Sequence, residues 1–177
     1  AGEGSDINGC YLRIVLETRD AEHINSIVTA LKEAGYHILD NWFINMEENK
    51  MAEIKKVHTT KAPEAIGPYS QATILNGVVY TSGQIAINPA TGNVESDTIE
   101  GQTEQIFKNL SAVLEEAGTS LDNTVKTVCF LADVERDFGA FNKVYEKFIK
   151  NKPARSCVAV KTLPKNVLCE VEVIAEA

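Results

Sequence analysis

From residue 53 onward, apolar positions switch between a strand-like period of two and a helical spacing of three and four residues. Amphipathic helices are predicted over 98–117 and over 137–150. Gly118, directly after the first helix, is expected to terminate it. The second helix is expected to turn its apolar side chains inward: Phe138, Phe141, Val144, Tyr145 and Phe148. Strands are predicted around the helices at 53–58, 72–76, 78–87, 124–133, from 153 and over 168–175. The order βββαβαββ predicts an α+β fold, with both helices on one face of a mixed sheet.

The last predicted strand has two unlike faces. Its odd-numbered positions are apolar and are expected to contact the helices: Cys169, Val171, Val173 and Ala175. Its even-numbered positions are largely acidic: Leu168, Glu170, Glu172, Ile174 and Glu176. In the preceding strand, alternation places Arg155, Cys157 and Ala159 on one face. We expect Arg155 and the acidic positions to share a sheet face that is turned toward water or another subunit.

The first fifty residues have a pattern of their own. A strand over 10–17, a helix ending at Gly35 and an extended stretch over 36–46 predict a small βαβ unit. Charged residues over 47–54 mark the boundary, so two parts are expected, 1–52 and 53–177. About fifty residues are marginal as an independent core, so the first part is expected to pack against a partner surface.

Composition narrows the classes of function. The chain has 17 basic and 25 acidic residues and a net charge of −8, which disfavours a nucleic-acid groove. No apolar run is long enough to predict a membrane span. The cysteines form no CxxC pair and indicate buried thiols in a reducing cytoplasm: Cys10, Cys129, Cys157 and Cys169. The three histidines lack metal-ligand spacing, so no metal site is predicted.

Two residues carry candidate chemistry. A guanidinium at the start of a strand, as at Arg155, is suited to bidentate binding of a carboxylate. A carboxylate such as Glu170 can act as a general base. From the residues alone, a surface ion pair for Arg155 and a solvated strand position for Glu170 remain open. Cys157 has no histidine placed by a motif to activate it, so an inert thiol is expected.

Four runs in sequence order resemble the RidA family of reactive-intermediate deaminases, also called YjgF-like or L-PSP proteins. They are GPYSQA at 67–72, YTSGQ at 80–84, PARS at 153–156 and CEVE at 169–172. The resemblance covers 53–177. It implies a chorismate-mutase-like fold, a homotrimer with sites in clefts between subunits, and no cofactor. The implied reaction is hydrolysis of 2-imino acids, such as 2-iminobutanoate and 2-iminopropanoate, to 2-keto acids and ammonia.

The resemblance also implies a role for each site residue. Arg155 would bind the substrate carboxylate, and Glu170 would activate the attacking water. The remaining positions would line or support the substrate site: Tyr69, Ser82, Gly83, Asn142 and, through its backbone, Cys157. Two other functions remain open, an endoribonuclease and a non-catalytic amino-acid-sensing module.

The first part of the chain resembles half of an ACT-type module, in particular the regulatory tail of threonine dehydratases. The likeness lies in its βαβ pattern and in the run LETRDAEH at 16–23. It implies a possible partnership or fusion with a threonine dehydratase, a pyridoxal-phosphate enzyme whose enamine product is the kind of compound that RidA proteins remove.

Overall fold

The computed structural model describes residues 21–36 and 53–177, and the chain divides into two compact units, Ala1–Asn49 and Lys50–Ala177. In the first unit, α1 spans Ala21–Glu33, where the sequence predicts a helix, and Gly35 follows in the left-handed region with φ of 85°. The predicted strand over 10–17 and nearly all of the stretch over 36–46 lie outside the described residues.

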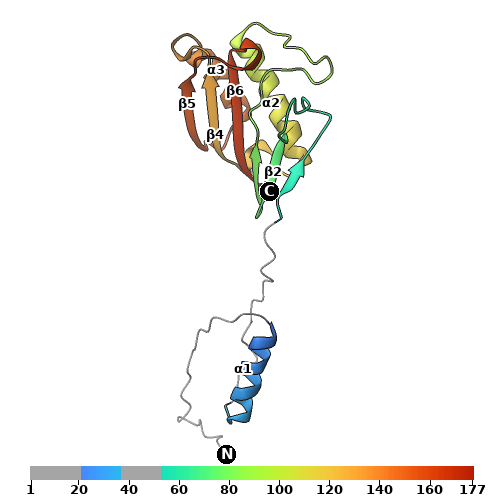
Figure 1. Cartoon of the computed structure of the whole chain (residues 1–177). Coiled ribbons are helices and arrows are strands. Elements are labelled where there is room, and N and C mark those ends of the chain that lie inside the picture. The colour runs from blue at the N-terminus through green and yellow to red at the C-terminus, as the bar shows by residue number, and fades with distance from the viewer. Residues whose placement is uncertain (1–20, 37–52) are drawn as a thin grey trace, which may run out of the picture. The chain divides into compact units, whose positions relative to one another are not determined.

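The second unit is built on one six-stranded sheet in the order β1-β2-β3-β6-β4-β5 (Figure 1). Its strands are β1 (Lys55–Val57), β2 (Ala72–Leu75), β3 (Val78–Thr81), β4 (Thr124–Leu131), β5 (Ala154–Ala159) and β6 (Cys169–Glu176). The β4–β5 pair is parallel and every other neighbouring pair is antiparallel. The sheet is therefore mixed, as predicted, and the last strand in the sequence lies in its interior.

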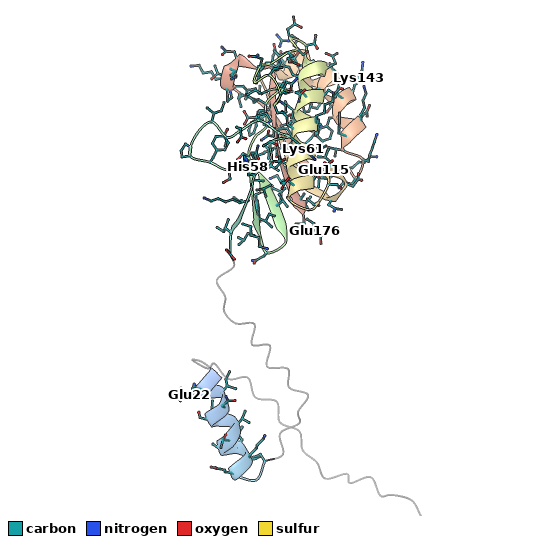
Figure 2. All side chains as sticks on the ribbon, turned by 90° about the vertical axis from the view of Figure 1, so that its right-hand side faces the viewer. Glu22, His58, Lys61, Glu115, Lys143 and Glu176 are labelled. Atoms are coloured by element: carbon teal, nitrogen blue, oxygen red, sulfur yellow. The ribbon has the colours of Figure 1, made fainter. Side chains whose placement is uncertain are left out.

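Two helices, α2 (Ile99–Glu116) and α3 (Val134–Phe148), pack on one face of this sheet (Figure 1). Side chains of Thr98 and Asp133 accept hydrogen bonds from the first-turn amides of α2 and α3 respectively. Short 3-10 turns precede β4 at η1 (Leu121–Asn123) and β6 at η2 (Pro164–Asn166). Charged side chains such as Glu115 and Lys143 point outward from the helices into solvent (Figure 2).

The core lies between the helices and the sheet, and β6 supplies its centre. The odd-numbered side chains of β6 are at most 1% exposed, which confirms the predicted apolar face: Cys169, Val171, Val173 and Ala175. They pack with fully buried α2 side chains: Ile106, Phe107, Leu110, Val113 and Leu114. These observations confirm the predicted α+β fold.

Two expectations about elements are wrong. The strand predicted over 78–87 ends at Thr81, because the Thr81 hydroxyl accepts the Val173 N–H at 2.9 Å in place of a backbone carbonyl. Beyond it only Gln84 pairs again with β6, as an isolated bridge to Val171. On α3, Phe138 does not turn into the core but is 38% exposed. After Thr81 the chain therefore no longer pairs continuously with β6.

Candidate active site

Arg155, near the start of β5, contacts three side chains of α3. Its Nη1 donates a hydrogen bond of 2.8 Å to Asn142 Oδ1. The guanidinium carbon lies 4.7 Å from the centre of the Tyr145 ring and 5.6 Å from that of Phe138. The arginine is exposed to solvent at this place. The structure thus brings two predicted site residues, Arg155 and Asn142, into direct contact.

The strand register explains why Arg155 meets α3. Arg155 pairs with Thr127 of β4, which in turn pairs with Val173 of β6. Thr127 and Val173 are buried on the helix-covered face, so Arg155 projects from that face as well. Cys157, two residues further along β5, pairs with the buried Cys129 on the same face.

Glu170 lies on the opposite face of the sheet, and this corrects the expectation that it shares a face with Arg155. It belongs to a row in which Phe130 pairs with both Glu170 and Val158. These positions alternate with the buried ones, so they face away from the helices. Within one chain, the candidate base and the candidate carboxylate-binding group therefore point in opposite directions.

Glu170 packs directly against Gly83. The backbone groups of Gln84 and Val171 are joined by N–H to O bonds of 2.9 and 3.1 Å, which places Gly83 beside the strand position of Glu170. A Cβ on Gly83 would overlap Glu170 Oε1 and lie 2.8 Å from its Cδ. Only glycine leaves room for the carboxylate in this position.

The environment of Glu170 favours its protonated form. Burial of the half-buried side chain raises its pKa above the ordinary glutamate value, and the negative charge of Glu172 raises it further. A carboxylate with a raised pKa binds a proton more strongly than an ordinary one. Glu170 thus has a property expected of a general base that acts near neutral pH.

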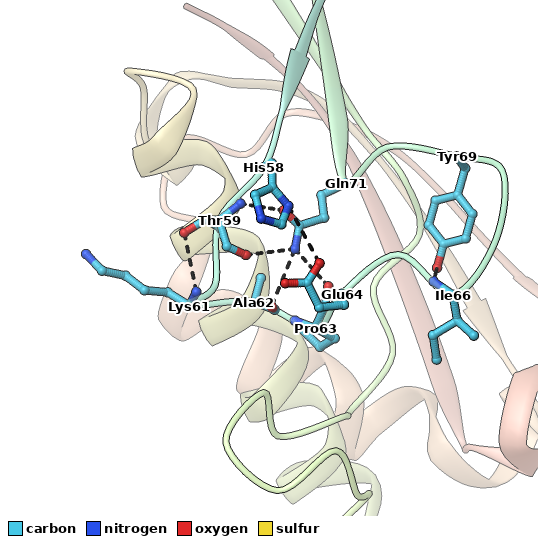
Figure 3. Close-up of polar contacts among 9 residues, drawn as sticks. All are labelled: His58, Thr59, Lys61, Ala62, Pro63, Glu64, Ile66, Tyr69 and Gln71. Atoms are coloured by element: carbon cyan, nitrogen blue, oxygen red, sulfur yellow. Dashed lines mark hydrogen bonds and ion pairs between the residues drawn. The ribbon is translucent and has the colours of Figure 1, made fainter.

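Tyr69 is carried by the loop between β1 and β2, which Gln71 holds together (Figure 3). The buried Gln71 amide donates to the carbonyls of Thr59 and Pro63 at 2.9 and 2.8 Å and accepts the Thr59 N–H at 2.7 Å. Tyr69 is 53% exposed, and its hydroxyl accepts the Ile66 N–H at 3.2 Å. Gln71 stands within the GPYSQA run, but it is not among the predicted site residues, because nothing local distinguishes it from a surface glutamine.

Ser82 joins this loop to the end of β3. Its hydroxyl donates to the Ser70 carbonyl at 2.6 Å, and its N–H donates to the Gln71 carbonyl at 2.9 Å. Ser82 precedes Gly83, so the loop with Tyr69 is tied to the backbone that contacts Glu170. Two clusters result: Arg155, Asn142 and Cys157 make the cationic cluster, and Glu170, Gly83 and Ser82 make the acidic cluster. Tyr69 lies on the neighbouring loop, where its hydroxyl contacts Ile66.

Three cysteines lie in the described part of the chain, and Cys129 and Cys169 are buried as predicted, whereas Cys157 is half-buried and Cys10 lies outside the described residues. Burial raises the pKa of Cys129 and of Cys169 to about 12. Burial also raises the pKa of Cys157, although the Arg155 charge opposes that shift. A thiolate nucleophile is therefore disfavoured at all three positions. Within residues 21–36 and 53–177, no cluster of His, Cys, Asp and Glu side chains is arranged to hold a metal ion.

An open groove of about 690 Å³ runs beside Arg155 along the end of α3. Its lining includes three lysines in addition to the arginine: Lys147, Lys150 and Lys152. The surroundings of the cationic cluster are thus basic, although the chain as a whole is acidic. In the described part of the chain, no helix is both long and apolar enough to cross a membrane.

Known proteins resemble this chain in sequence and in fold. A family model described as Endoribonuclease L-PSP matches residues 59–177. A Lactococcus lactis protein named AldR is 55% identical over 124 residues, which cover 70% of this chain and 98% of that protein. YyfA of Yersinia pestis, from the conserved Rid protein family, is 46% identical with a TM-score of 0.68, over 71% of this chain and 100% of YyfA. TdcF of E. coli, solved with bound serine, is 39% identical with a TM-score of 0.66, over 70% of this chain and 98% of TdcF. The chain therefore belongs to the RidA, YjgF or L-PSP family.

Proposed function

We propose that this protein is an imine deaminase that hydrolyses 2-imino acids to 2-keto acids and ammonia. The observation that carries this proposal is the state of Arg155. Its guanidinium is exposed and held by Asn142, and among the described residues it forms no ion pair with a carboxylate. Its remaining N–H groups are suited to a planar carboxylate ligand. Membership of a family that includes imine deaminases supports the same conclusion.

Glu170 supplies the proton transfer that the reaction needs. As the oxygen of a water molecule bonds to the imine carbon, Glu170 accepts a proton from that water. The same proton then passes to the nitrogen of the tetrahedral intermediate. Glu170 then accepts the hydroxyl proton of this intermediate and returns it to the nitrogen, so that the carbon–nitrogen bond breaks, ammonia leaves and the keto C=O forms. The raised pKa of Glu170 suits both the acceptance and the return of this proton.

The two clusters point to a site shared between copies of the chain, and we propose a homotrimer. Arg155 and Glu170 of one chain lie on opposite faces of its sheet, so a small ligand cannot contact both of them. A ligand can contact an arginine and a glutamate of this kind only if a second copy of the chain supplies one of the two. The face that carries Glu170 also exposes apolar side chains, including Val158 at 46% and Tyr80 at 43%. Exposed apolar area of this kind is typical of a surface that another chain covers.

For the substrate, we propose small aliphatic imino acids such as 2-iminobutanoate and 2-iminopropanoate. The serine bound to TdcF is a small molecule with a carboxylate next to a carbon that bears nitrogen. A threonine dehydratase, which releases the matching enamine, is the proposed partner in the cell. Rates measured with imines generated from threonine, serine and a bulky amino acid would rank the substrates.

The test is a deaminase assay in which semicarbazide competes for the imine formed in place by an enamine-releasing enzyme. Arg155→Ala should lower kcat/KM by about 30- to 1000-fold, the effect of losing a charge-assisted contact of about 2–4 kcal/mol. Arg155→Lys should restore only part of this, because an ammonium lacks the planar fork.

Glu170→Gln should lower kcat with little change in binding of 2-oxobutanoate, because Arg155 still binds the carboxylate. Glu176→Gln, on the same strand and face, is the matched control and should keep the wild-type rate. The spontaneous rate of imine hydrolysis must be subtracted in every case. Full turnover by Glu170→Gln above that background would refute the proposed mechanism.

An endoribonuclease is the second candidate, because the matching family model carries that description. The net charge of −8 disfavours RNA binding. A labelled single-stranded RNA incubated with wild type and with Glu170→Gln distinguishes the two activities. Cleavage that is abolished in the variant, without imine hydrolysis in the wild type, would favour the nuclease.

A further inference from the structure

Three side chains on one face of α3 surround the guanidinium of Arg155. Phe138, Asn142 and Tyr145 are four and three residues apart, the spacing that aligns side chains along one side of a helix. Asn142 Oδ1 accepts a hydrogen bond of 2.8 Å from Nη1, and the two ring centres lie 4.7 Å (Tyr145) and 5.6 Å (Phe138) from the guanidinium carbon. Both distances are within the range of cation–π contacts.

Tyr145 is itself held by two buried neighbours, Thr127 and Phe107. Its hydroxyl shares a hydrogen bond of 2.9 Å with the Thr127 hydroxyl, and Thr127 is the β4 residue that pairs with Arg155. Its ring meets Phe107 edge-on, with centres 5.5 Å apart. Both partners are fully buried, so the Tyr145 ring has little freedom to move.

Among these three residues, Phe138 is the one whose position is not explained by packing in the core. Its side chain is 38% exposed on a helix whose other aromatic residues pack inward. An exposed phenylalanine contributes little to the core. Its ring instead covers the guanidinium, which connects its position to Arg155.

We propose that Phe138, Asn142 and Tyr145 are positioning residues that hold the Arg155 guanidinium in one orientation before the substrate carboxylate arrives. The proposal rests on the proposed function in that it assigns Arg155 to carboxylate binding. A free arginine side chain loses rotamer entropy when it is ordered. Contacts that order it in advance leave less of this cost to be met on binding.

The direct test is the order of the Arg155 side chain, measured by NMR of its Nε–H group in the full chain. The sequence contains four arginines, Arg13, Arg19, Arg136 and Arg155, so Arg155→Lys assigns the signal. Wild type should show an ordered Nε–H that is shifted by the ring current of Tyr145. Tyr145→Phe keeps the ring and should keep both properties, whereas Tyr145→Leu should lose them.

Phe138→Leu is the second variant, because Tyr145 is buried and its replacement by leucine threatens folding. At an exposed position, Phe138→Leu should leave the fold intact and still reduce the order of Arg155. Phe148→Leu is the matched control: it is an aromatic residue on the same helix that stacks on Phe107, with ring centres 5.1 Å apart. If Arg155 is as ordered in Phe138→Leu as it is in wild type and in Phe148→Leu, the proposal is overturned.

Binding of 2-oxobutanoate and the kinetics of imine hydrolysis form the second readout. Phe138→Leu should raise Kd and KM by about 2- to 30-fold, the range of one cation–π contact, while kcat changes less than about 2-fold. If Arg155 loses order in the variant but neither wild type nor variant binds 2-oxobutanoate or hydrolyses imines, the positioning role stands and the proposed function fails. Unchanged KM together with unchanged order would reject the positioning role alone.

Discussion

At the scale of single residues, the most informative pair is Glu170 and Glu172. They lie two positions apart on β6 and therefore project from the same face of the sheet. Burial raises the pKa of Glu170 first, and the charge of Glu172 adds to that shift. Activity that needs ionised Glu170 is lost as the pH falls through this raised pKa. In the profile of rate against pH, the acid limb should therefore lie at a higher pH than the ordinary glutamate pKa of about 4.3.

Replacing Glu172 by glutamine tests this coupling. The negative charge that raises the pKa of Glu170 is removed, so that pKa falls and activity persists to lower pH. The profile of kcat/KM against pH should shift its acid limb downward, with the plateau near neutral pH little changed. Glu176→Gln is the control that should leave the limb in place. A limb that stays fixed or moves upward in Glu172→Gln would show that Glu170 is not the titrating base.

Gly83 provides a second residue-scale prediction. In Gly83→Ala the new methyl group displaces the Glu170 carboxylate, so activity should fall, while the free energy of unfolding should drop by at most about 1 kcal/mol because the displaced atoms end a flexible side chain. The double variant Gly83→Ala/Glu170→Ala removes the overlap, so its stability loss should be smaller than the sum of the single losses. Denaturation in urea measures all three. Gly139→Ala on α3, where a Cβ meets nothing within 4 Å, is the control and should not destabilise the chain.

Candidate site residues could be proposed from the sequence, but the directions of their side chains could not be predicted. Motifs point to Arg155 and Glu170, and alternation within each strand is correct. Whether two strands place their residues on the same face depends on register, because a slip of one position reverses every side chain. Here Thr127 pairs with both Arg155 and Val173, and no local pattern reports that pairing.

At the scale of elements, the loop between β1 and β2 depends on one side chain. Gln71→Leu removes the hydrogen bonds of its amide, so the Thr59 N–H and the carbonyls of Thr59, Ala62 and Pro63 lose this buried partner. We expect a loss of about 1–3 kcal/mol in unfolding free energy for each group left unpaired. The loop that carries Tyr69 should loosen, which hydrogen exchange of the Thr59 amide would detect as faster exchange.

Lys61→Ala is the control for this experiment. The Lys61 side chain lies in the same loop and points away from Gln71 (Figure 3). Its removal should change neither stability nor exchange. If Gln71→Leu exchanges the Thr59 amide no faster than Lys61→Ala does, the loop is held by its backbone and not by Gln71.

Element boundaries followed the sequence where local chemistry sets them. The helix α2 agrees with the predicted range to within one residue at each end, because Thr98 caps its start and Gly118 follows its end with φ of 85°. The start of α3 lies three residues before the prediction, since Asp133 is its cap. The end of β3 was not predicted, because it depends on a contact with another strand. There the Thr81 hydroxyl, in place of a backbone carbonyl, accepts the hydrogen bond from the Val173 N–H of β6.

At the scale of the whole molecule, the two clusters make assembly testable through function. Light scattering should give about three times the chain mass of 19.3 kDa. If the site is shared, mixing unfolded Arg155→Ala with Glu170→Gln and refolding them together should restore activity. In a ring with random mixing, about a quarter of the sites receive both intact halves.

The control for this mixing is a refolded sample of each variant alone, which should stay inactive. A monomer at micromolar concentration would contradict the shared site. So would a trimer in which mixing restores nothing, because that result places both groups of one site in one copy. The described unit from residue 53 contains both clusters, so removal of the preceding segment should leave this complementation intact.

The place of β6 in the sheet has a consequence for how the protein is made. Strand β6 lies between β3 and β4, yet it is the last of the six strands to be synthesised. While it is still inside the ribosome, β3 and β4 are exposed without the strand that joins them, and the buried faces of α2 and α3 have only part of the sheet to cover them. Unpaired edges of this kind attract other chains. The nascent protein is therefore expected to depend on chaperones until Glu176 emerges, and to complete the fold of this sheet only after that point.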